Sequence, residues 1–464
     1  MLKYLYRYNT QIIVFIILCA VFARFLKIEY LPYADDGDEM AYIFAGQSLL
    51  TQGVPISWSS FTNSARTPVS YEMLSYPVEP KTDFHFVQPW FDHMYFVPLL
   101  MGSWSLAWGY DFPSVPPALV YRLPMLLVSL AVLYLVYTIT QKHFGTLAGI
   151  FSLLVLGFSP GLILIHRMVV AENFLNLFFL LTYYFYIQKK PLYYLIIGSF
   201  LAAAVKVTGL AIIPIITFFF IFEKQYKRAA IYFLTSLALA FAGYALYGAL
   251  IDWQAFVTTL EQQSYRLLGW SNPAFIFSHP GFHIYTMLDM SYYLIPMLAL
   301  GLWYGEDTKV AKQLATVCIA LFTLIWITSA EQDMLGWYKI PLFSFLTIAA
   351  GAVIAYQKYY LAIILLCITL VNNLGLIRYP THPLPDTFIL RGVVAVVIGF
   401  SVLYLFYSKK VKMHGYFLGL LCVLYIIQGL YVTNAMYAAR CKDRICPIPL
   451  VTVRSTVERF AKSL

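Results

Sequence analysis

The sequence predicts an all-α integral membrane protein, folded as a bundle of about 13 transmembrane helices. Of its 464 residues, 61% are hydrophobic and 18% are aromatic, whereas 11% are charged. That composition is far from the composition of soluble globular domains of this length. A helix that crosses a bilayer needs roughly 20 mostly apolar residues, and about 13 stretches of the chain meet that requirement.

The predicted spans follow one another with short connections, except at two long loops. Lys3 and Arg7 precede the first apolar run. No small-residue cleavage pattern follows that run, so we expect a retained signal anchor. The fifth and sixth spans divide near Gly209 without a polar loop between them. The expected spans are 10–26, 117–139, 146–165, 171–188, 192–207, 209–222, 230–250, 288–304, 313–329, 340–357, 360–377, 388–407 and 415–434.

Short basic loops indicate how the protein is oriented in the membrane. If the N-terminus is cytoplasmic, alternation of the spans places every short basic loop on the cytoplasmic side, as the positive-inside rule requires. The formal net charge of +9 then follows from topology and argues against a nucleic-acid partner. We expect a multi-pass cell-membrane protein whose C-terminus and polar site are extracytoplasmic. The basic loops are 141–143, 188–190, 223–228, 309–312, residue 358 and 409–412.

Two long extracytoplasmic loops interrupt the transmembrane domain, which we assign to residues 1–434. The first loop covers 27–117 and the second covers 252–287. Within the first, 38–52 and 92–109 have helical patterns that are too short or too polar to span a bilayer. Such segments lie in the membrane interface, which also suits the tryptophans at positions 58, 90, 104 and 108.

A short extracytoplasmic tail is expected over residues 435–464. Because it leaves no room for a module that would present a protein substrate, it favours a small or lipid-borne acceptor. Cys441 and Cys446 lie in this tail, where a disulfide is permitted. A metal pair is the alternative, but no third or fourth ligand is nearby, so we favour a small disulfide loop. The other four cysteines lie inside apolar spans as packing residues: Cys19, Cys318, Cys367 and Cys422.

The most informative polar feature is an acidic segment at residues 35–39, with four carboxylates in five positions. The sequence continues from Asp38 with helical period, so these acids would occupy a first turn, where the helix dipole favours anions. A plain helix cap at the water interface is the structural alternative. If the outer loops converge, a carboxylate could take the proton of an acceptor hydroxyl while cations hold a departing phosphate. That is the chemistry of glycosyl transfer from a lipid-phosphate sugar.

Motifs in the first half of the chain resemble those of the GT-C glycosyltransferases. The resemblance is greatest to the branch of the protein O-mannosyltransferases and lipid A aminoarabinose transferases, which is dolichyl-phosphate-mannose-protein mannosyltransferase-like. The sequence departs at Met94 and Tyr95, where relatives usually have prolines, and at Glu172, where they more often have Asp. The matching segments are Gly37–Tyr42, Phe91–His93 with Gly109, Tyr121–Pro124, Phe144–Asn173, Lys206–Gly209 with Pro214 and, in outline, Trp337–Pro341.

The resemblance implies a GT-C fold with interfacial helices in the first outer loop, a polyprenyl-phosphate sugar as donor and a general-base, inverting transfer. Asp38 would be the catalytic base, and Glu39 would support it or orient the acceptor. Asp92 would be a second acidic residue of the site. His93 would contact the lipid phosphate, where relatives often use Lys. The acceptor could be a lipid, a glycan or a protein hydroxyl, and membrane lipids would surround the site.

Further candidates come from charge and from the side of the membrane. Arg266, Lys339 and Lys206 are candidate phosphate ligands. Each has a structural alternative: Arg266 could be a solvated loop charge, Lys206 could end a span, and His93 could be an interface histidine without a ligand. The remaining candidates are Arg122, Arg167, Glu172 and Tyr338, of which the two arginines could be snorkelling or packing residues.

We expect no obligatory cofactor. Asp38 and Glu39, with neighbouring acids, could supply the hard oxygen ligands of a divalent cation that holds the donor phosphate. The closer relatives mostly rely on basic residues instead, so we favour a metal-independent site.

Three other functions compete with glycosyl transfer. A lipid or lipid-linked sugar flippase would place charges near mid-membrane and often contains an inverted repeat, whereas here the charges gather on one face and no repeat is visible. A polysaccharide ligase or polymerase would concentrate arginines in a late loop, but 252–287 contains Arg266 alone. A scaffolding protein would leave the acidic segment unexplained.

Overall fold

The structure is a computed structural model of the chain. It describes residues 9–29, 37–59, 67–69, 85–114, 116–265, 273–274, 276, 289–304, 306–329, 336–376, 392, 395–396, 399 and 414–440.

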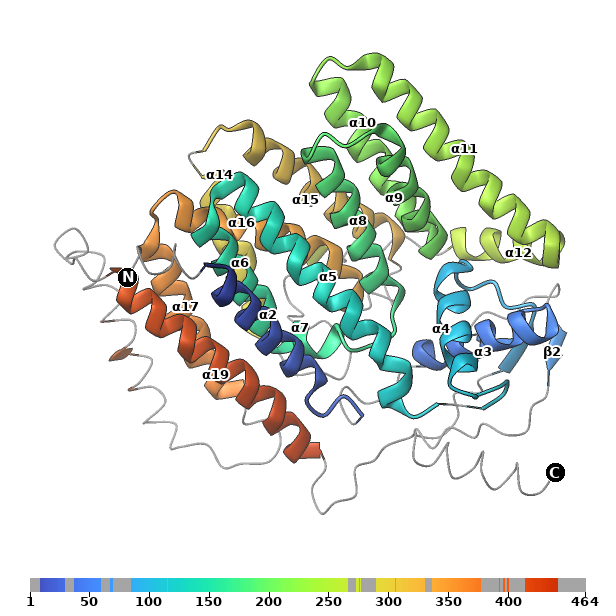
Figure 1. Cartoon of the computed structure of the whole chain (residues 1–464), viewed down its shortest axis with the longest axis horizontal. Coiled ribbons are helices and arrows are strands. Elements are labelled where there is room, and N and C mark those ends of the chain that lie inside the picture. The colour runs from blue at the N-terminus through green and yellow to red at the C-terminus, as the bar shows by residue number, and fades with distance from the viewer. Residues whose placement is uncertain are drawn as a thin grey trace.

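Helices occupy the predicted spans wherever the structure describes them (Figure 1). The predicted span 388–407 lies almost wholly outside the described residues, as does the cysteine pair of the tail. The helices are α2 (Asn9–Phe25), α5 (Ala118–Phe144), α6 (Thr146–Phe158), α7 (Pro160–Ile165), α8 (Ala171–Ile187), α9 (Leu192–Val205), α10 (Ile212–Phe222), α11 (Tyr226–Ile251), α14 (Ser291–Trp303), α15 (Lys309–Thr328), α16 (Ile340–Ala355), α17 (Tyr359–Leu376) and α19 (His414–Arg440), with 3-10 turns η1 (Val207–Ala211) and η2 (Gly336–Lys339).

One predicted span, 146–165, is broken in two. Helix α6 ends at Phe158, and α7 begins at Pro160 after an extended Ser159. Proline cannot donate the backbone hydrogen bond of a helix interior, and it disfavours helical geometry in the residue before it. The break therefore falls at the residue that precedes the proline.

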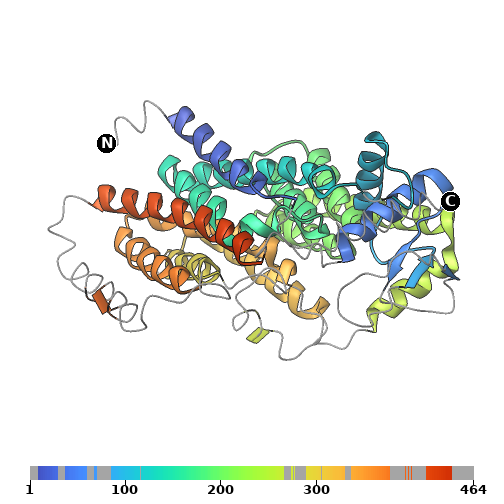
Figure 2. The same ribbon diagram turned by 90° about the horizontal axis from the view of Figure 1, so that it is seen from below.

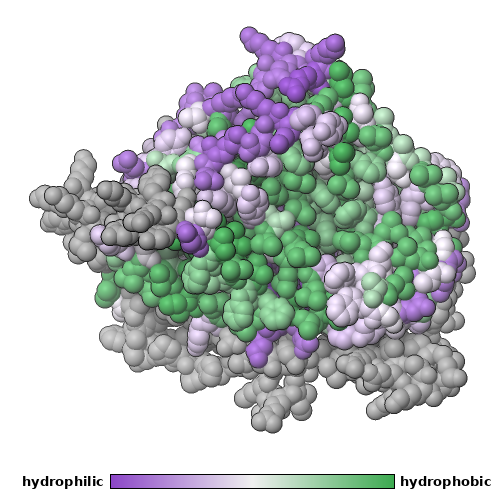
Figure 3. All heavy atoms as spheres, viewed as in Figure 1, coloured by the Kyte–Doolittle hydropathy of each residue, from purple (hydrophilic) through white to green (hydrophobic). Residues whose placement is uncertain are grey.

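The fold is that of an integral membrane protein. Five of the described helices are long and apolar enough to cross a membrane, and seven shorter apolar helices accompany them. Figure 3 shows a mainly hydrophobic face, with hydrophilic residues gathered along its upper edge over the ends of α10 and α11. The total of about 13 spans stays a prediction.

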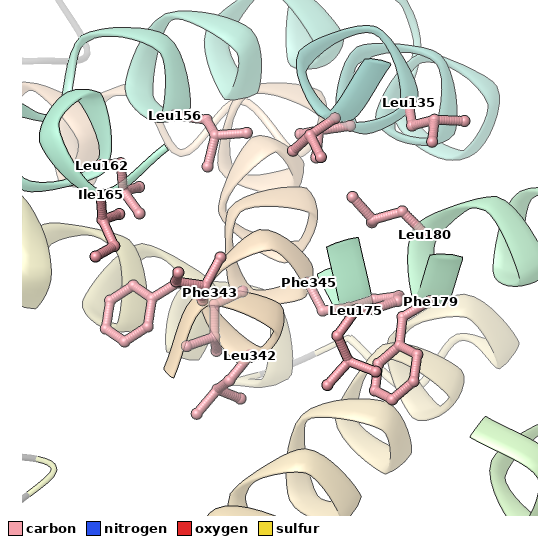
Figure 4. Close-up of a cluster of buried hydrophobic side chains, with 14 of the residues drawn as sticks. Leu135, Leu156, Leu162, Ile165, Leu175, Phe179, Leu180, Leu342, Phe343 and Phe345 are labelled. Carbon is pink, nitrogen blue, oxygen red and sulfur yellow. The ribbon is translucent and has the colours of Figure 1, made fainter. Parts of the chain in front are cut away.

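Helix α16 forms the centre of the bundle. Every residue from Ile340 to Ile354 is buried, and a helix that is apolar all round is suited to such a central position. Figure 4 shows Leu342, Phe343 and Phe345 of α16 among buried leucines and phenylalanines from α5, α6, α7 and α8. This packing fixes the ends of those helices relative to one another, and therefore the polar residues that the ends carry.

The two helices predicted in the first long loop are present as α3 (Gly37–Gln52) and α4 (Phe96–Ala107), and their position in the membrane interface stays a prediction. They cross where Gly46 faces Gly102, and a Cβ at Gly46 would lie 1.8 Å from the carbonyl oxygen of Pro98. Side chains at this crossing would force the two backbones apart, so the glycines set how closely α3 is held. Figures 1 and 2 both place α3 and α4 at one end of the long axis, beside α12 (Trp253–Ser264).

A small antiparallel sheet also lies in the first loop, which the all-α prediction did not include. Strands β1 (Ser57–Ser59) and β2 (Thr67–Val69) flank β3 (His85–Gln88). Trp58 is paired with Phe86 in the β1–β3 register, and both rings pack on Phe44 of α3. The sheet therefore supports the buried face of the helix that begins at the acidic segment.

Candidate active site at the start of helix α3

The first turn of α3 contains Asp38 and Glu39, and the two carboxylates have different surroundings. Glu39 is fully buried and receives hydrogen bonds from Arg122 of α5, Nε to Oε1 at 3.0 Å and Nη2 to Oε2 at 2.5 Å. The main-chain N–H of Val169 also donates to Glu39 Oε1, at 2.9 Å. Arg122 donates further to the carbonyl of Ile28. Glu39 therefore connects α3, α5 and the segment before α8, and its lack of exposed surface suits support of Asp38 rather than contact with an acceptor.

Two further arginines are packing residues beneath this turn. Arg167 donates to the carbonyl of Ala23 at 2.5 Å, and Arg24 donates to the carbonyls of Ala20 and Gly157. The Ala23 and Gly157 carbonyls lie in the final turns of α2 and α6, where the helix dipole favours a cation. Both arginine side chains are buried, so they hold helix ends together inside the protein. Arg24 was not among the sequence candidates because it lies inside an apolar span.

Asp92 and His93 lie in the turn before α4 and face α3. Ser59 of β1 donates to Asp92 Oδ2 at 2.5 Å, which ties this carboxylate to the small sheet. The His93 ring lies 5.1 Å from the Tyr42 ring and 5.8 Å from the Trp90 ring, centroid to centroid. His93 is half-buried. The Tyr42 and Trp90 rings thus hold the His93 imidazole beside α3. Asp38 precedes Tyr42 by four residues, so it lies on the same face of that helix.

A second ion pair joins the start of α8 to the end of α9. The Lys206 ammonium lies 2.7 Å from Glu172 Oε1. It also lies 4.4 Å from the centre of the Tyr338 ring, which contributes a cation–π contact from η2. The start of α8, the end of α9 and the η2 turn therefore meet at one place.

Of the other predicted phosphate ligands, the structure describes Lys339 but not Arg266. Lys339 is 2% exposed, with its ammonium 5.0 Å from the centre of the Tyr292 ring of α14. It therefore lies inside the bundle, next to the Lys206–Tyr338 contact. Arg266 lies outside the described residues.

Asp38 is half-buried at the centre of these groups. Removal from water and then the negative charge of Glu172 raise the pKa of Asp38 to about 6, whereas the Lys206 ammonium lowers it. Asp92 and Glu39 add smaller upward contributions to the pKa. A carboxylate with a pKa near neutrality retains affinity for a proton while staying ionised, which is what a general base requires.

The described residues contain no group of three His, Cys, Asp or Glu side chains arranged to hold a metal ion. Both oxygens of Glu39 already accept hydrogen bonds from Arg122, and Oε1 accepts a further one from Val169. Glu39, one of the two acids that could have supplied ligands to a divalent cation, is thus engaged within the protein.

The structure also brings residues to the site that the sequence did not single out. Tyr42 and Trp90 surround His93, Ser59 holds Asp92, and Gln263 of α12 donates to the Asp92 carbonyl at 3.0 Å. Tyr42 follows Asp38 by one helical turn, so helical spacing alone could have identified it. Trp90 lies three residues before His93, whereas Ser59 and Gln263 come from a strand and a helix far away in sequence, where no local pattern marks them.

Neither a protein-family model nor a curated protein matches this sequence. Among solved structures, ArnT from Cupriavidus metallidurans bound to undecaprenyl phosphate aligns with a TM-score of 0.58 and 13% identity, covering 92% of this chain and 76% of that chain. The apo state of ArnT from Cupriavidus metallidurans gives a TM-score of 0.52 and 14% identity, over 93% and 77% of the two chains. ArnT is a lipid A aminoarabinose transferase with the GT-C architecture. The chain therefore has the GT-C membrane fold that its motifs predicted.

Proposed function

We propose that this protein is a membrane glycosyltransferase that moves a sugar from a polyprenyl-phosphate donor to an acceptor hydroxyl on the extracytoplasmic face. The observation that carries the proposal is the position of Asp38, in the first turn of an interfacial helix, beside Glu172, Lys206 and Asp92. The GT-C fold agrees with it, and the ArnT structure with bound undecaprenyl phosphate supports a lipid phosphate as the leaving group.

In the proposed reaction, Asp38 accepts the proton of the acceptor hydroxyl. The acceptor oxygen forms a bond to the anomeric carbon as the bond from that carbon to the phosphate oxygen breaks, so the configuration inverts. The bonding electrons leave with the polyprenyl phosphate. Positively charged or hydrogen-bond-donating groups at the site would stabilise the charge that develops on the phosphate. Our candidates are His93 and Lys339 among the described residues and Arg266 outside them.

The position of the site relative to the apolar helices supports such a donor. Arg122, Glu172 and Tyr338 lie at or near the ends of apolar segments, where we expect a lipid phosphate to reside while its tail stays in the bilayer. A soluble nucleotide-sugar donor would gain nothing from this position.

The test is donor consumption by purified protein in nanodiscs, with a panel of polyprenyl-phosphate sugars and a crude membrane extract as the acceptor source. We expect wild type to consume one donor and Asp38→Asn to consume none, although the variant keeps near-wild-type thermal stability. Asn preserves size and hydrogen bonding but cannot act as the base. A folded Asp38→Asn variant with full activity would exclude the mechanism. No consumption by folded wild type across the panel would favour a flippase instead.

A further inference from the structure

The Glu172–Lys206 pair is built into the ends of two helices. Glu172 lies in the first turn of α8, and Lys206 directly follows the last residue of α9. The helix dipole favours an anion at the former place and a cation at the latter. The two charged atoms are 2.7 Å apart, and the side chains are 4% and 20% exposed. Both charges are therefore fixed in position and only weakly screened by water.

The start of α8 is also bonded to α3, the helix that contains Asp38. The N–H of Val169 donates to Glu39, and the Ala171 main chain hydrogen-bonds the Tyr42 hydroxyl. Both bonded residues follow Asp38 on its own helix, one residue and four residues further on. Glu172, the residue after Ala171, is thereby held beside the Asp38 carboxylate.

Lys206 has a defined partner on its other side. Its ammonium lies over the Tyr338 ring at 4.4 Å, so the Glu172 carboxylate and the Tyr338 ring both hold it. A lysine that is committed in this way is poorly suited to follow a departing phosphate. It is well suited to supply a constant positive field. The structure therefore favours this role for Lys206 over the phosphate contact that the sequence indicated.

We propose that Glu172 and Lys206 are positioning residues for Asp38, a fixed anion and a fixed cation whose opposing fields act on the carboxylate that accepts the proton. The catalytic part of this proposal rests on the proposed glycosyl transfer. The largest electrostatic influences on the pKa of Asp38 come from these two residues, with Glu172 raising it and Lys206 lowering it. Among the residues that the structure describes, the other charged or titratable groups near Asp38 include Glu39 with its partner Arg122, Tyr42, Asp92, His93 and Tyr338.

The first test needs no substrate. The carboxyl stretch of Asp38 is identified by infrared difference spectra between wild type and Asp38→Asn, and it is titrated in the full-length protein in nanodiscs. We expect a midpoint of about 6 in wild type. Lys206→Met should raise the midpoint by about one pH unit and Glu172→Gln should lower it by about one, because Lys206 lowers and Glu172 raises the pKa of Asp38 and a neighbouring charge shifts a carboxyl pKa by about one to three units.

Three further variants keep the test decisive. The double variant Glu172→Gln/Lys206→Met loses both charges, so neither is left unpaired. Its Asp38 midpoint should lie between those of the two single variants. Lys206→Arg retains the charge and should retain the wild-type midpoint. Lys309→Met removes a cation at the opposite end of the bundle and serves as the matched control, with no shift expected.

The same variants give the second test, the pH dependence of kcat/KM. A base must be deprotonated, so activity should rise as the pH increases through the Asp38 midpoint, and this limb should shift with the infrared titration. Unmoved midpoints in both single variants would overturn the proposal. Shifted midpoints with no transfer in any variant would leave the arrangement of charges intact and remove the proposed function, so the two failures are distinguishable.

Discussion

Replacement of Glu39 by Gln should cost this protein a large part of its stability. Glu39 and Arg122 are both fully buried and joined by two hydrogen bonds of 3.0 and 2.5 Å. The substitution neutralises one partner and leaves the guanidinium charged in the protein interior. Removal of one partner from a buried ion pair costs about 3–5 kcal/mol. The Gln amide can still accept the Val169 hydrogen bond, so we expect about 3 kcal/mol, the lower end of that range.

The assay is reversible unfolding in mixed micelles with increasing SDS, followed by tryptophan fluorescence. The matched control is Lys309→Met, which breaks the ion pair with Glu223. That pair has a similar distance, 2.6 Å, but its side chains are 56% and 20% exposed. Exposed ion pairs contribute about 1 kcal/mol or less, so the control should unfold almost as wild type does.

A double-mutant cycle separates the charge from the packing. Glu39→Gln combined with Arg122→Met removes both charges and should regain part of the lost free energy, because no uncompensated guanidinium remains. If Glu39→Gln and Lys309→Met cost equal free energy, burial of the pair does not determine its strength and the reasoning is refuted. Additive effects of Glu39→Gln and Arg122→Met would equally refute it.

Two further predictions concern helix packing and donor binding. Gly46→Ala should destabilise the protein by about 3 kcal/mol, because its Cβ would lie 1.8 Å from the Pro98 carbonyl oxygen and overpacking of this kind costs about 1–3 kcal/mol or more. Unfolding in SDS measures the loss, with Ser103→Ala on the exposed face of α4 as the control. Equal stability of the two variants would contradict the close crossing of α3 and α4. His93→Ala should raise the donor KM more than the acceptor KM, since the imidazole is our candidate phosphate ligand. Steady-state kinetics with each substrate varied in turn measures both constants. An unchanged donor KM would mean that the histidine serves only packing.

The sequence by itself determined the elements of this protein and the ends at which its polar residues lie. Apolar length and the position of each charge are local properties, so α5 and α8 could be placed within a few residues of their observed bounds. Charged residues are costly inside a bilayer, so Asp38, Arg122 and Lys206 had to mark helix ends. The GT-C fold followed from motifs in order along the first half of the chain, without any one of them being specific.

The tertiary structure alone decided which of these residues are partners. Glu39 pairs with Arg122 across 83 positions, and Glu172 pairs with Lys206 across 34. An ion pair forms where folding brings two side chains within a few ångströms, and no local pattern encodes that distance. The same holds for the strand that supplies Ser59 to Asp92. The physical reason is that sequence periodicity fixes the face and end of one helix, whereas the packing of α16 against α5, α6 and α8 fixes the distances between helices, and the chemistry of the site depends on those distances.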